Sequence, residues 1–466
     1  MRSLLDALTR NAIGLVGSAL TTASAAVFLA LLFLDVTGRA AGPYLGIVAY
    51  LILPAFFLLG LLLIPLGLAL ERRRRARASA AAGSAVPLPV IDLNLRRTRT
   101  MVLGFLALTA VNVALLGIAT YKGAEAMETT KFCGTTCHAI MQPEYTSHAR
   151  SVHAGVRCVA CHIGPGGGWY VRAKMNGARQ AVQAITGHYD RPVPAPVRTL
   201  RAAPEICGEC HQPARDAGDR RRVIRHRSDD EKNSAQETVL LMHVGGRRGD
   251  AATGIHWHAD PSTRIRYHSD PARTVIDTVE LTAPDGKVTV FKAKTKQEPP
   301  AGAVAESGGA AGEWRTMDCV DCHNRAAHPS VSPETEVDAA LDAGTIDPGL
   351  PFVRRESVRL LKETKGTVDQ ARGELAVGLR AFYEKEQAAT AASQGEAIAA
   401  AGRALGDLYA RNLFPAMAVG WGTYADHLGH DAWPGCWRCH DGDHVAPDGM
   451  VISQDCEACH REVTPS

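Results

Sequence analysis

Residues 131–162 read KFCGTTCHAIMQPEYTSHARSVHAGVRCVACH and contain two cysteine couples, each followed at once by histidine. All 12 cysteines of the chain fall in six such couples. The first, Cys133-GTT-Cys137-His138, has one residue more than the C-x-x-C-H spacing of the other five. Chance predicts about 0.01 C-x-x-C-H matches in this composition. The five standard motifs are Cys158/Cys161/His162, Cys207/Cys210/His211, Cys319/Cys322/His323, Cys436/Cys439/His440 and Cys456/Cys459/His460.

The spacing of these motifs suits covalent haem attachment. Two thiols three residues apart reach the two vinyl groups of one haem, and the adjacent histidine meets the iron from the same side. Zinc sites use two couples per ion and need no histidine after each couple. Structural disulfides rarely join cysteines so close, although redox enzymes use such pairs. The sequence therefore predicts six haem c groups, with the six motif histidines as iron ligands, on the extracytoplasmic side of a membrane.

Three uncharged apolar runs precede the motifs, at residues 12–34, 44–70 and 101–120. Each reaches the ~20 residues that a helix needs to span a bilayer. A cleavable signal peptide is the alternative for the first run, but the run is too long and lacks a small-residue cleavage site. Pro54 and Pro65 predict kinks in the second run. We therefore expect three transmembrane helices within residues 1–120.

The segment between the second and third runs, residues 71–100, is rich in arginine. The positive-inside rule predicts a cytoplasmic loop here, a cytoplasmic amino terminus and a haem domain on the outer, periplasmic side of the membrane. Recognition of specific lipids is the alternative for these arginines. The net charge of +3 does not suggest a nucleic-acid partner. Residues 78–95 are typical of a linker. The arginines are Arg72, Arg73, Arg74, Arg75, Arg77, Arg96, Arg97 and Arg99.

The part after the third run divides into three regions. Residues 121–211 carry three haem motifs, and residues 317–466 carry three more around a helical stretch at 353–412. Residues 212–316 have no cysteine, and the alternating pattern TVIDTVELTAPDGKVTVFKAK with Asp285-Gly286 at its centre predicts a hairpin. The expected fold is a membrane-anchored multihaem cytochrome c. Its outer domain is mostly helical and irregular, packed around haems, with a small β-containing insertion.

The second ligand of each iron must come from outside the motif histidines. A histidine that closely follows a motif cannot bind the second side of the iron of that motif, because the porphyrin lies in between. We therefore expect His328 and His444 to bind the irons of neighbouring haems. His153, which closely precedes the second motif, is a further candidate. Met141, three residues after His138, is a weaker ligand that raises the potential, or it packs against the haem.

Two short segments offer alternative ligands that the sequence does not separate. His427 and His430, in YADHLGH, compete for one iron. His256 and His258, in GIHWH, share a face if the segment is a strand, and one of them is expected to be a ligand. A structural pair without metal is the other interpretation of the second segment.

The segment from Lys131 to Pro192 is similar to the NapC/NirT family of membrane-anchored multihaem quinol dehydrogenases. CVDCHNRAAH, at residues 319–328, resembles the fourth haem motif of that family. The remainder, with three spans and two further motifs, is similar to the larger inner-membrane cytochromes of metal-reducing bacteria. The resemblance implies that quinol is oxidised beside the first haem and that electrons pass along the haem chain.

Carried over by position, the resemblance assigns Cys133, Cys137 and His138 to the first haem, with Met141 in place of the motif methionine. His153 and His328 match distal histidines. The chain departs from the family in its longer first motif, with the methionine one position further on. It also has Gln180 where the family has an acidic residue, and Lys174 lies one position away from the quinol-site lysine. We expect His188 and Asp190, in TGHYD, to replace the missing proton acceptor.

The function expected is electron transfer from menaquinol, drawn from the quinone pool, through six haems to periplasmic c-type cytochromes or a terminal reductase. One alternative is a multihaem terminal reductase of a small inorganic substrate, which needs an iron with an open position; the sequence contains no C-x-x-C-K motif. A passive anchor or redox sensor is another, and the short cytoplasmic segments disfavour it. The sequence leaves open the final acceptor and the oligomeric state.

Overall fold

The computed structural model describes residues 12–37, 48–81, 93–136, 139–164, 167–197, 200–211, 218–248, 251–295 and 312–463. The chain forms two compact units, Met1–Cys137 and His138–Ser466. This boundary falls inside the first haem motif, whereas the sequence pattern set the end of the membrane part at residue 120.

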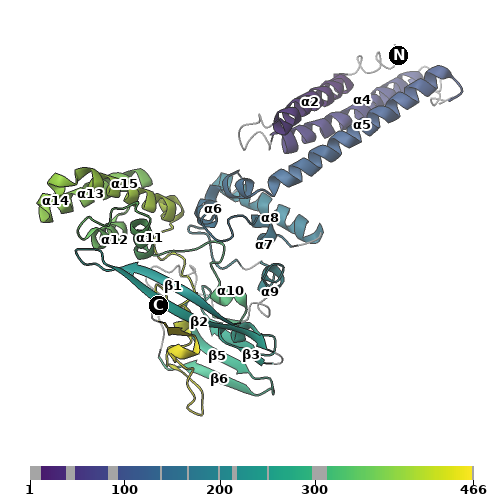
Figure 1. The fold of residues 1–466 in the computed structure, drawn as a ribbon. Helices are drawn as coiled ribbons and strands as arrows, with labels where there is room; N and C mark the ends of the chain where they lie inside the picture. The colour runs from purple at the N-terminus through teal and green to yellow at the C-terminus, as the bar shows by residue number, and fades with distance from the viewer. Residues whose placement is uncertain are drawn as a thin grey trace. The chain divides into compact units, whose positions relative to one another are not determined.

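The first unit is built from long apolar helices (Figure 1). Three of them have the length and hydropathy of membrane spans, within Ala12–Leu34, Leu53–Glu71 and Arg96–Met127, so the described residues contain the three long apolar helices that the sequence predicts. Pro65 lies inside the second helix, and a π-helical turn precedes Pro54. The elements are α2 (Ala12–Val36), η1 (Val48–Ile52), α4 (Leu53–Ala81), α5 (Arg96–Met127) and η2 (Phe132–Thr136).

Glycine allows α2 and α4 to pack closely. A Cβ atom added to Gly60 would lie 2.8 Å from the Gly17 carbonyl oxygen, and one added to Gly17 would lie 2.9 Å from the Gly60 carbonyl oxygen. Small residues at such crossings let helix backbones approach each other in a membrane, where packing drives association.

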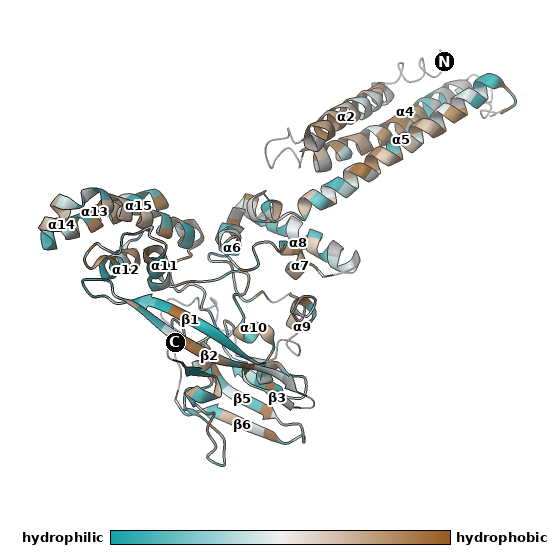
Figure 2. Ribbon diagram, viewed as in Figure 1, coloured by the Kyte–Doolittle hydropathy of each residue, from teal (hydrophilic) through white to brown (hydrophobic). Residues whose placement is uncertain are grey.

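The arginines of residues 71–100 lie at the ends of two helices, and residues 82–92 between these helices lie outside the described residues. Arg72 to Arg77 belong to the end of α4, and Arg96, Arg97 and Arg99 begin α5. The expected linker at 78–95 is therefore shorter than predicted on its amino-terminal side, because α4 continues to Ala81. Figure 2 shows hydrophilic residues gathered where α4 ends and α5 begins, beyond the apolar parts of both helices.

Helices in the second unit form their own apolar core. Residues 353–412 are helical, as expected, and an additional helix precedes them. Leu375, Leu379 and Leu405 are fully buried between these helices, and Tyr383 donates from its hydroxyl to the Pro351 carbonyl oxygen at 2.9 Å. The helices are α11 (Pro333–Asp342), α12 (Val353–Glu363), α13 (Val368–Glu386), α14 (Ala388–Ser393) and α15 (Gly395–Asn412).

Two antiparallel sheets accompany the helices. A short strand after the fifth motif and a strand that begins at the histidine of the sixth motif complete them. The first sheet joins β1 (Gly218–Arg227), β2 (Ala235–Arg248), β3 (Ala251–Thr253) and β9 (His460–Glu462). The second has the order β7 (Glu313–Thr316), β4 (Arg264–Ser269), β5 (Ile276–Thr282), β6 (Val288–Ala293) and β8 (His444–Val445). The hairpin predicted at Asp285-Gly286 is confirmed between β5 and β6, where Gly286 has a φ of +83°.

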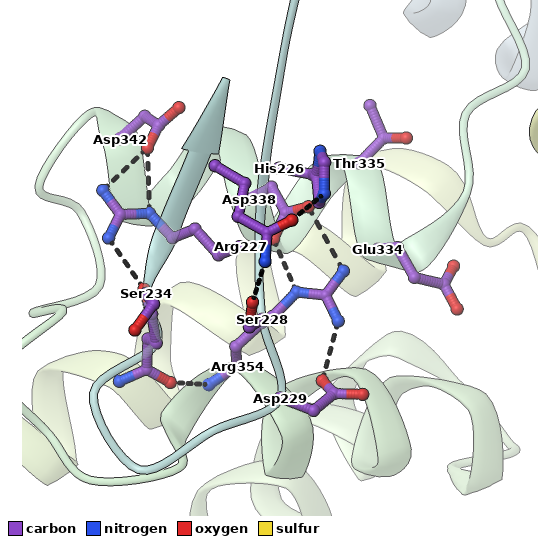
Figure 3. A network of polar contacts seen from close by, with 12 residues as sticks. His226, Arg227, Ser228, Asp229, Ser234, Glu334, Thr335, Asp338, Asp342 and Arg354 are labelled. Carbon is purple, nitrogen blue, oxygen red and sulfur yellow. Dashed lines mark hydrogen bonds and ion pairs between the residues drawn. The ribbon is translucent and has the colours of Figure 1, made fainter. Parts of the chain in front are cut away.

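A polar network holds the β1–β2 hairpin against the helices (Figure 3). Arg354 donates to the carboxylates of Asp338, at 2.8 Å, and Asp229, at 2.7 Å. Arg227 pairs with Asp342 at 2.8 Å. Since β9 pairs with β2, these ion pairs also fix the strand on which His460 lies.

Candidate functional site

The motif backbones adopt short helical turns that suit their spacing. Cys158–His162 forms a turn of α-helix, α7, and Cys319–Cys322 forms α10, which a capping box on Asp318 begins. Cys133 lies in the π-helical turn η2, which accommodates one residue more per turn than an α-helix. That geometry explains how the first motif carries its extra residue. Cys137 and His138 lie outside the described residues.

Four motif histidines each face one histidine from outside the motifs. The ring centres are separated by 6.3 Å for His162 and His328, 6.0 Å for His211 and His153, 5.8 Å for His440 and His258, and 6.1 Å for His460 and His430. An iron held between two imidazoles separates their ring centres by about 6 Å, since each metal–nitrogen bond is about 2 Å long. The pairs therefore fit axial ligation of haem iron.

The hydrogen bonds of these rings support the same arrangement. In each bonded ring Nδ1 donates to a backbone carbonyl oxygen, which leaves Nε2 for a metal and fixes the tautomer. The distances are 3.1 Å from His153 to Ala326, 3.0 Å from His328 to Glu144, 2.8 Å from His258 to Ile255 and 2.6 Å from His440 to Ser453.

The fourth motif has His256 as its neighbour. Burial lowers the pKa of His323, and the nearby His256 lowers it further. Both histidines of GIHWH therefore approach motif histidines, His256 near His323 and His258 near His440. The segment is a 3-10 turn, η4 (Ile255–Ala259), rather than a strand, so the two side chains diverge and can serve different irons.

The structure separates the remaining candidates. His444 was expected to serve a neighbouring haem, but both ring nitrogens are bonded, Nδ1 to Asp441 at 2.9 Å and Nε2 to the Ile276 carbonyl oxygen at 3.1 Å. The fully buried ring thus fastens β8 to the sheet. His430, not His427, faces His460. Burial and the neighbouring charge of Arg438 lower the pKa of His427 to about 2.

His148, one of the twelve histidines outside the motifs, is a further candidate ligand that the sequence did not single out. Its ring is buried, and its centre lies 5.9 Å from that of His328. His148 ends α6 (Gln142–His148), five residues before His153, and this pairing of histidines ahead of the second motif was the available signal. Met141 is half-buried at the start of the same helix.

Consecutive motifs from the second to the sixth lie beside one another. Burial raises the pKa of Cys161, and the nearby Cys210 thiol adds to the effect. The thiols of Cys207 and Cys319 are hydrogen-bonded. Burial raises the pKa of Cys322 to about 11, with Cys436 as a neighbour. Burial also raises the pKa of Cys459, and Cys436 is again close. The attachment points thus follow each other in space in chain order.

A buried arginine joins the fourth and fifth motifs. Arg438, inside the fifth motif, donates to the carbonyl oxygens of Asp321 at 2.7 Å, Arg273 at 2.6 Å and Gly435 at 2.8 Å. The Asp321 carboxylate, inside the fourth motif, accepts from Tyr267 at 2.5 Å. The separation between the two attachment points is therefore set by charge-assisted hydrogen bonds.

The residues expected at a quinol site lie on or after one helix, α8 (Gly167–Thr186). Lys174 is half-buried and Gln180 is exposed. Six residues correspond to about 120° around a helix once whole turns are removed, so these two side chains point in different directions. His188 and Asp190 are exposed in the segment that follows. The structure therefore does not bring Gln180 to Lys174.

Residues 96–212 match the family model described as the NapC/NirT cytochrome c family, N-terminal region. The chain is also 34% identical to the cytochrome c-type protein ImcH of Geobacter sulfurreducens over 458 residues, which cover 97% of this chain and 88% of that protein. The chain belongs to the NapC/NirT cytochrome c family. As a NapC/NirT cytochrome it is a membrane-anchored multihaem electron-transfer protein with covalently bound haem c. No solved structure matches it.

Proposed function

We propose that this NapC/NirT cytochrome transfers electrons from menaquinol in the inner membrane, through six haem c groups, to periplasmic c-type cytochromes or a terminal reductase. The observation that carries the proposal is the run of neighbouring attachment motifs, in which four motif histidines face a second histidine at about 6 Å. An iron with two histidine ligands can transfer electrons but has no open position for a substrate. The pairs therefore favour electron transfer rather than reduction of a substrate at one of the irons.

The proposed ligand set follows from these contacts. His162 with His328, His211 with His153, His440 with His258 and His460 with His430 are paired by ring contact. We add His323 with His256 from their proximity. Bound haem supplies one-electron redox chemistry, and the chain sets the position and axial ligands of each group.

The first motif is the proposed entry point. Cys133 follows the end of α5 by six residues, so haem attached there stays close to the membrane. His138 and one of Met141 or His148 are its proposed iron ligands. The amino terminus and the arginine-rich ends of α4 and α5 are proposed to be cytoplasmic, with residues 138–466 in the periplasm.

Quinol oxidation releases two electrons and two protons, while each haem accepts one electron. The protons therefore need a side chain or water at the membrane surface. Lys174, His188 and Asp190 are the proposed groups, because they lie on α8 or just after it, shortly beyond the second motif. Gln180 cannot accept a proton at neutral pH, so we propose a hydrogen-bonding role at most.

The test is rapid anaerobic mixing of the purified holoprotein in nanodiscs with a menaquinol analogue, following the c-haem absorbance. We expect the quinol analogue to reduce the haems on the time scale of rapid mixing. The rate of haem reduction should fall at least tenfold in His188→Gln or Lys174→Gln. Arg380→Gln, a change of an exposed side chain on α13 of the second unit, is the control. Full reduction by dithionite but none by quinol would reject membrane entry and leave a protein electron donor.

A further inference from the structure

Helix α8 exposes a continuous apolar stripe. Val171, Met175, Val182 and Ile185 are 60, 67, 60 and 86% exposed, and Ala178 between them is exposed as well. Their spacing of four, three, four and three residues places all five within about 80° of the helix circumference. Scattered apolar side chains are normal on protein surfaces, but an aligned stripe of this kind marks a contact surface.

Cationic side chains border this stripe on both sides. Arg172 and Arg179 follow its first and third members by one residue, which puts them on one border, and Lys174 lies on the other. The far side carries Ala173, Gly177 and Ala184, which are half-buried. The small residues therefore lie on the less exposed side of the helix, and the large apolar residues lie together on the exposed stripe.

We propose that the apolar face of α8 lies in the outer interfacial layer of the bilayer that holds the three spans, with the bordering cations at the level of the lipid phosphates. A helix with an apolar face between basic borders is the form that binds in the plane of an anionic membrane surface. Long cationic side chains reach from such a face to the phosphates. This inference depends on the proposed function in one respect only, namely that residues 138–466 lie on the periplasmic side of the membrane.

The chain itself supplies the reason for choosing lipid over a soluble partner. α8 begins 40 residues after the last apolar helix ends, so the helix is tethered to a membrane-embedded segment. Burial of four large apolar side chains in the interface would remove them from water, which favours binding of the helix to the bilayer.

Site-directed spin labelling of the full-length holoprotein in anionic nanodiscs tests the proposal. The native cysteines carry haem, so Val182→Cys or Ile185→Cys provides a single free thiol. Asn176→Cys, on the polar side of the same helix, is the matched control. The accessibility of the nitroxide to oxygen, which partitions into lipid, is compared with its accessibility to a water-soluble nickel chelate.

The expected result is an oxygen-to-nickel accessibility ratio at residues 182 and 185 at least fivefold higher than at residue 176. High nickel accessibility at all three positions would overturn the proposal, because the stripe would then face water. Low accessibility to both reagents at 182 and 185 would also overturn it, since protein or porphyrin would cover the stripe. Dipolar coupling between labels on two chains would identify a second copy as the occupant. Quinol reduction measured on the same samples separates failure of this inference from failure of the proposed function.

Discussion

The indole ring of Trp437 lies flat against the imidazole ring of His430, with the ring centres 4.4 Å apart and the planes 10° from parallel. Trp437 stands between the two cysteines of the fifth motif, whereas His430 faces His460 of the sixth. The planes of His430 and His460 are 27° apart, while those of His258 and His440 differ by 70°. One motif thus orients a proposed ligand of the next.

Replacing Trp437 with leucine should free the ring plane of His430. The relative orientation of two axial imidazoles sets the anisotropy of a low-spin haem spectrum, so the signal of one haem should change while the others stay. Loss of the stacking should also cost about 0.5–1.5 kcal/mol of stability. Electron paramagnetic resonance and denaturant unfolding measure the two effects.

Trp314→Leu is the matched control for this change. Trp314 is also half-exposed and lies against a histidine, His268, with the ring centres 5.6 Å apart and the planes tilted by 52°. His268 bonds to Asp277 and faces no motif histidine in the described structure. Replacing Trp314 should therefore leave every haem signal unchanged. Equal spectral changes in both variants would contradict the role assigned to Trp437.

His430→Ala and His427→Ala should have different effects. The first removes the proposed ligand of the sixth iron, so one haem should become high-spin, a change that resonance Raman spectroscopy detects. The second removes a buried ring beside Arg438, so it should lower stability by about 1–3 kcal/mol with every haem still low-spin. A high-spin haem in the His427 variant alone would reverse the assignment.

The buried His427 also predicts a pH dependence of stability. Its pKa in the folded chain is lowered to about 2, mainly by burial and then by Arg438, against about 6.5 for an unfolded histidine. The unfolded chain therefore binds more protons below pH 6.5. This residue alone should cost about 1.4 kcal/mol per pH unit as the pH falls from 6 to 4. The same pH series on His427→Gln should show a slope smaller by that amount, and an unchanged slope would contradict the burial argument.

Arg438→Met should separate the fourth and fifth motifs. It removes three hydrogen bonds from a buried guanidinium to carbonyl oxygens and should destabilise the second unit by about 3 kcal/mol or more. Guanidinium unfolding, followed by circular dichroism, measures this. Arg380→Met removes only an exposed pair with Glu384 and should cost less than about 0.5 kcal/mol.

Local patterns predicted much of this molecule. The cysteine spacing indicated haem attachment, and hydropathy indicated three apolar helices, because both depend on neighbours in the chain. Ligand pairing did not follow, since His162 and His328 are brought together only by the folded second unit. For the same reason the choice between His427 and His430, the structural role of His444 and the pairing of β8 and β9 with distant strands needed three-dimensional contacts.

The measurement that tests the central claim most directly is the number of low-spin, bis-histidine haems in the purified protein. Intact mass counts the haems attached to each chain, and near-infrared magnetic circular dichroism distinguishes histidine–histidine from histidine–methionine and high-spin iron. The six cysteine motifs predict six haems, and the facing histidines predict that at least five of them have two histidine ligands. Two or more haems that are high-spin or methionine-ligated would contradict the ligand pairs, and with them the proposed conducting chain.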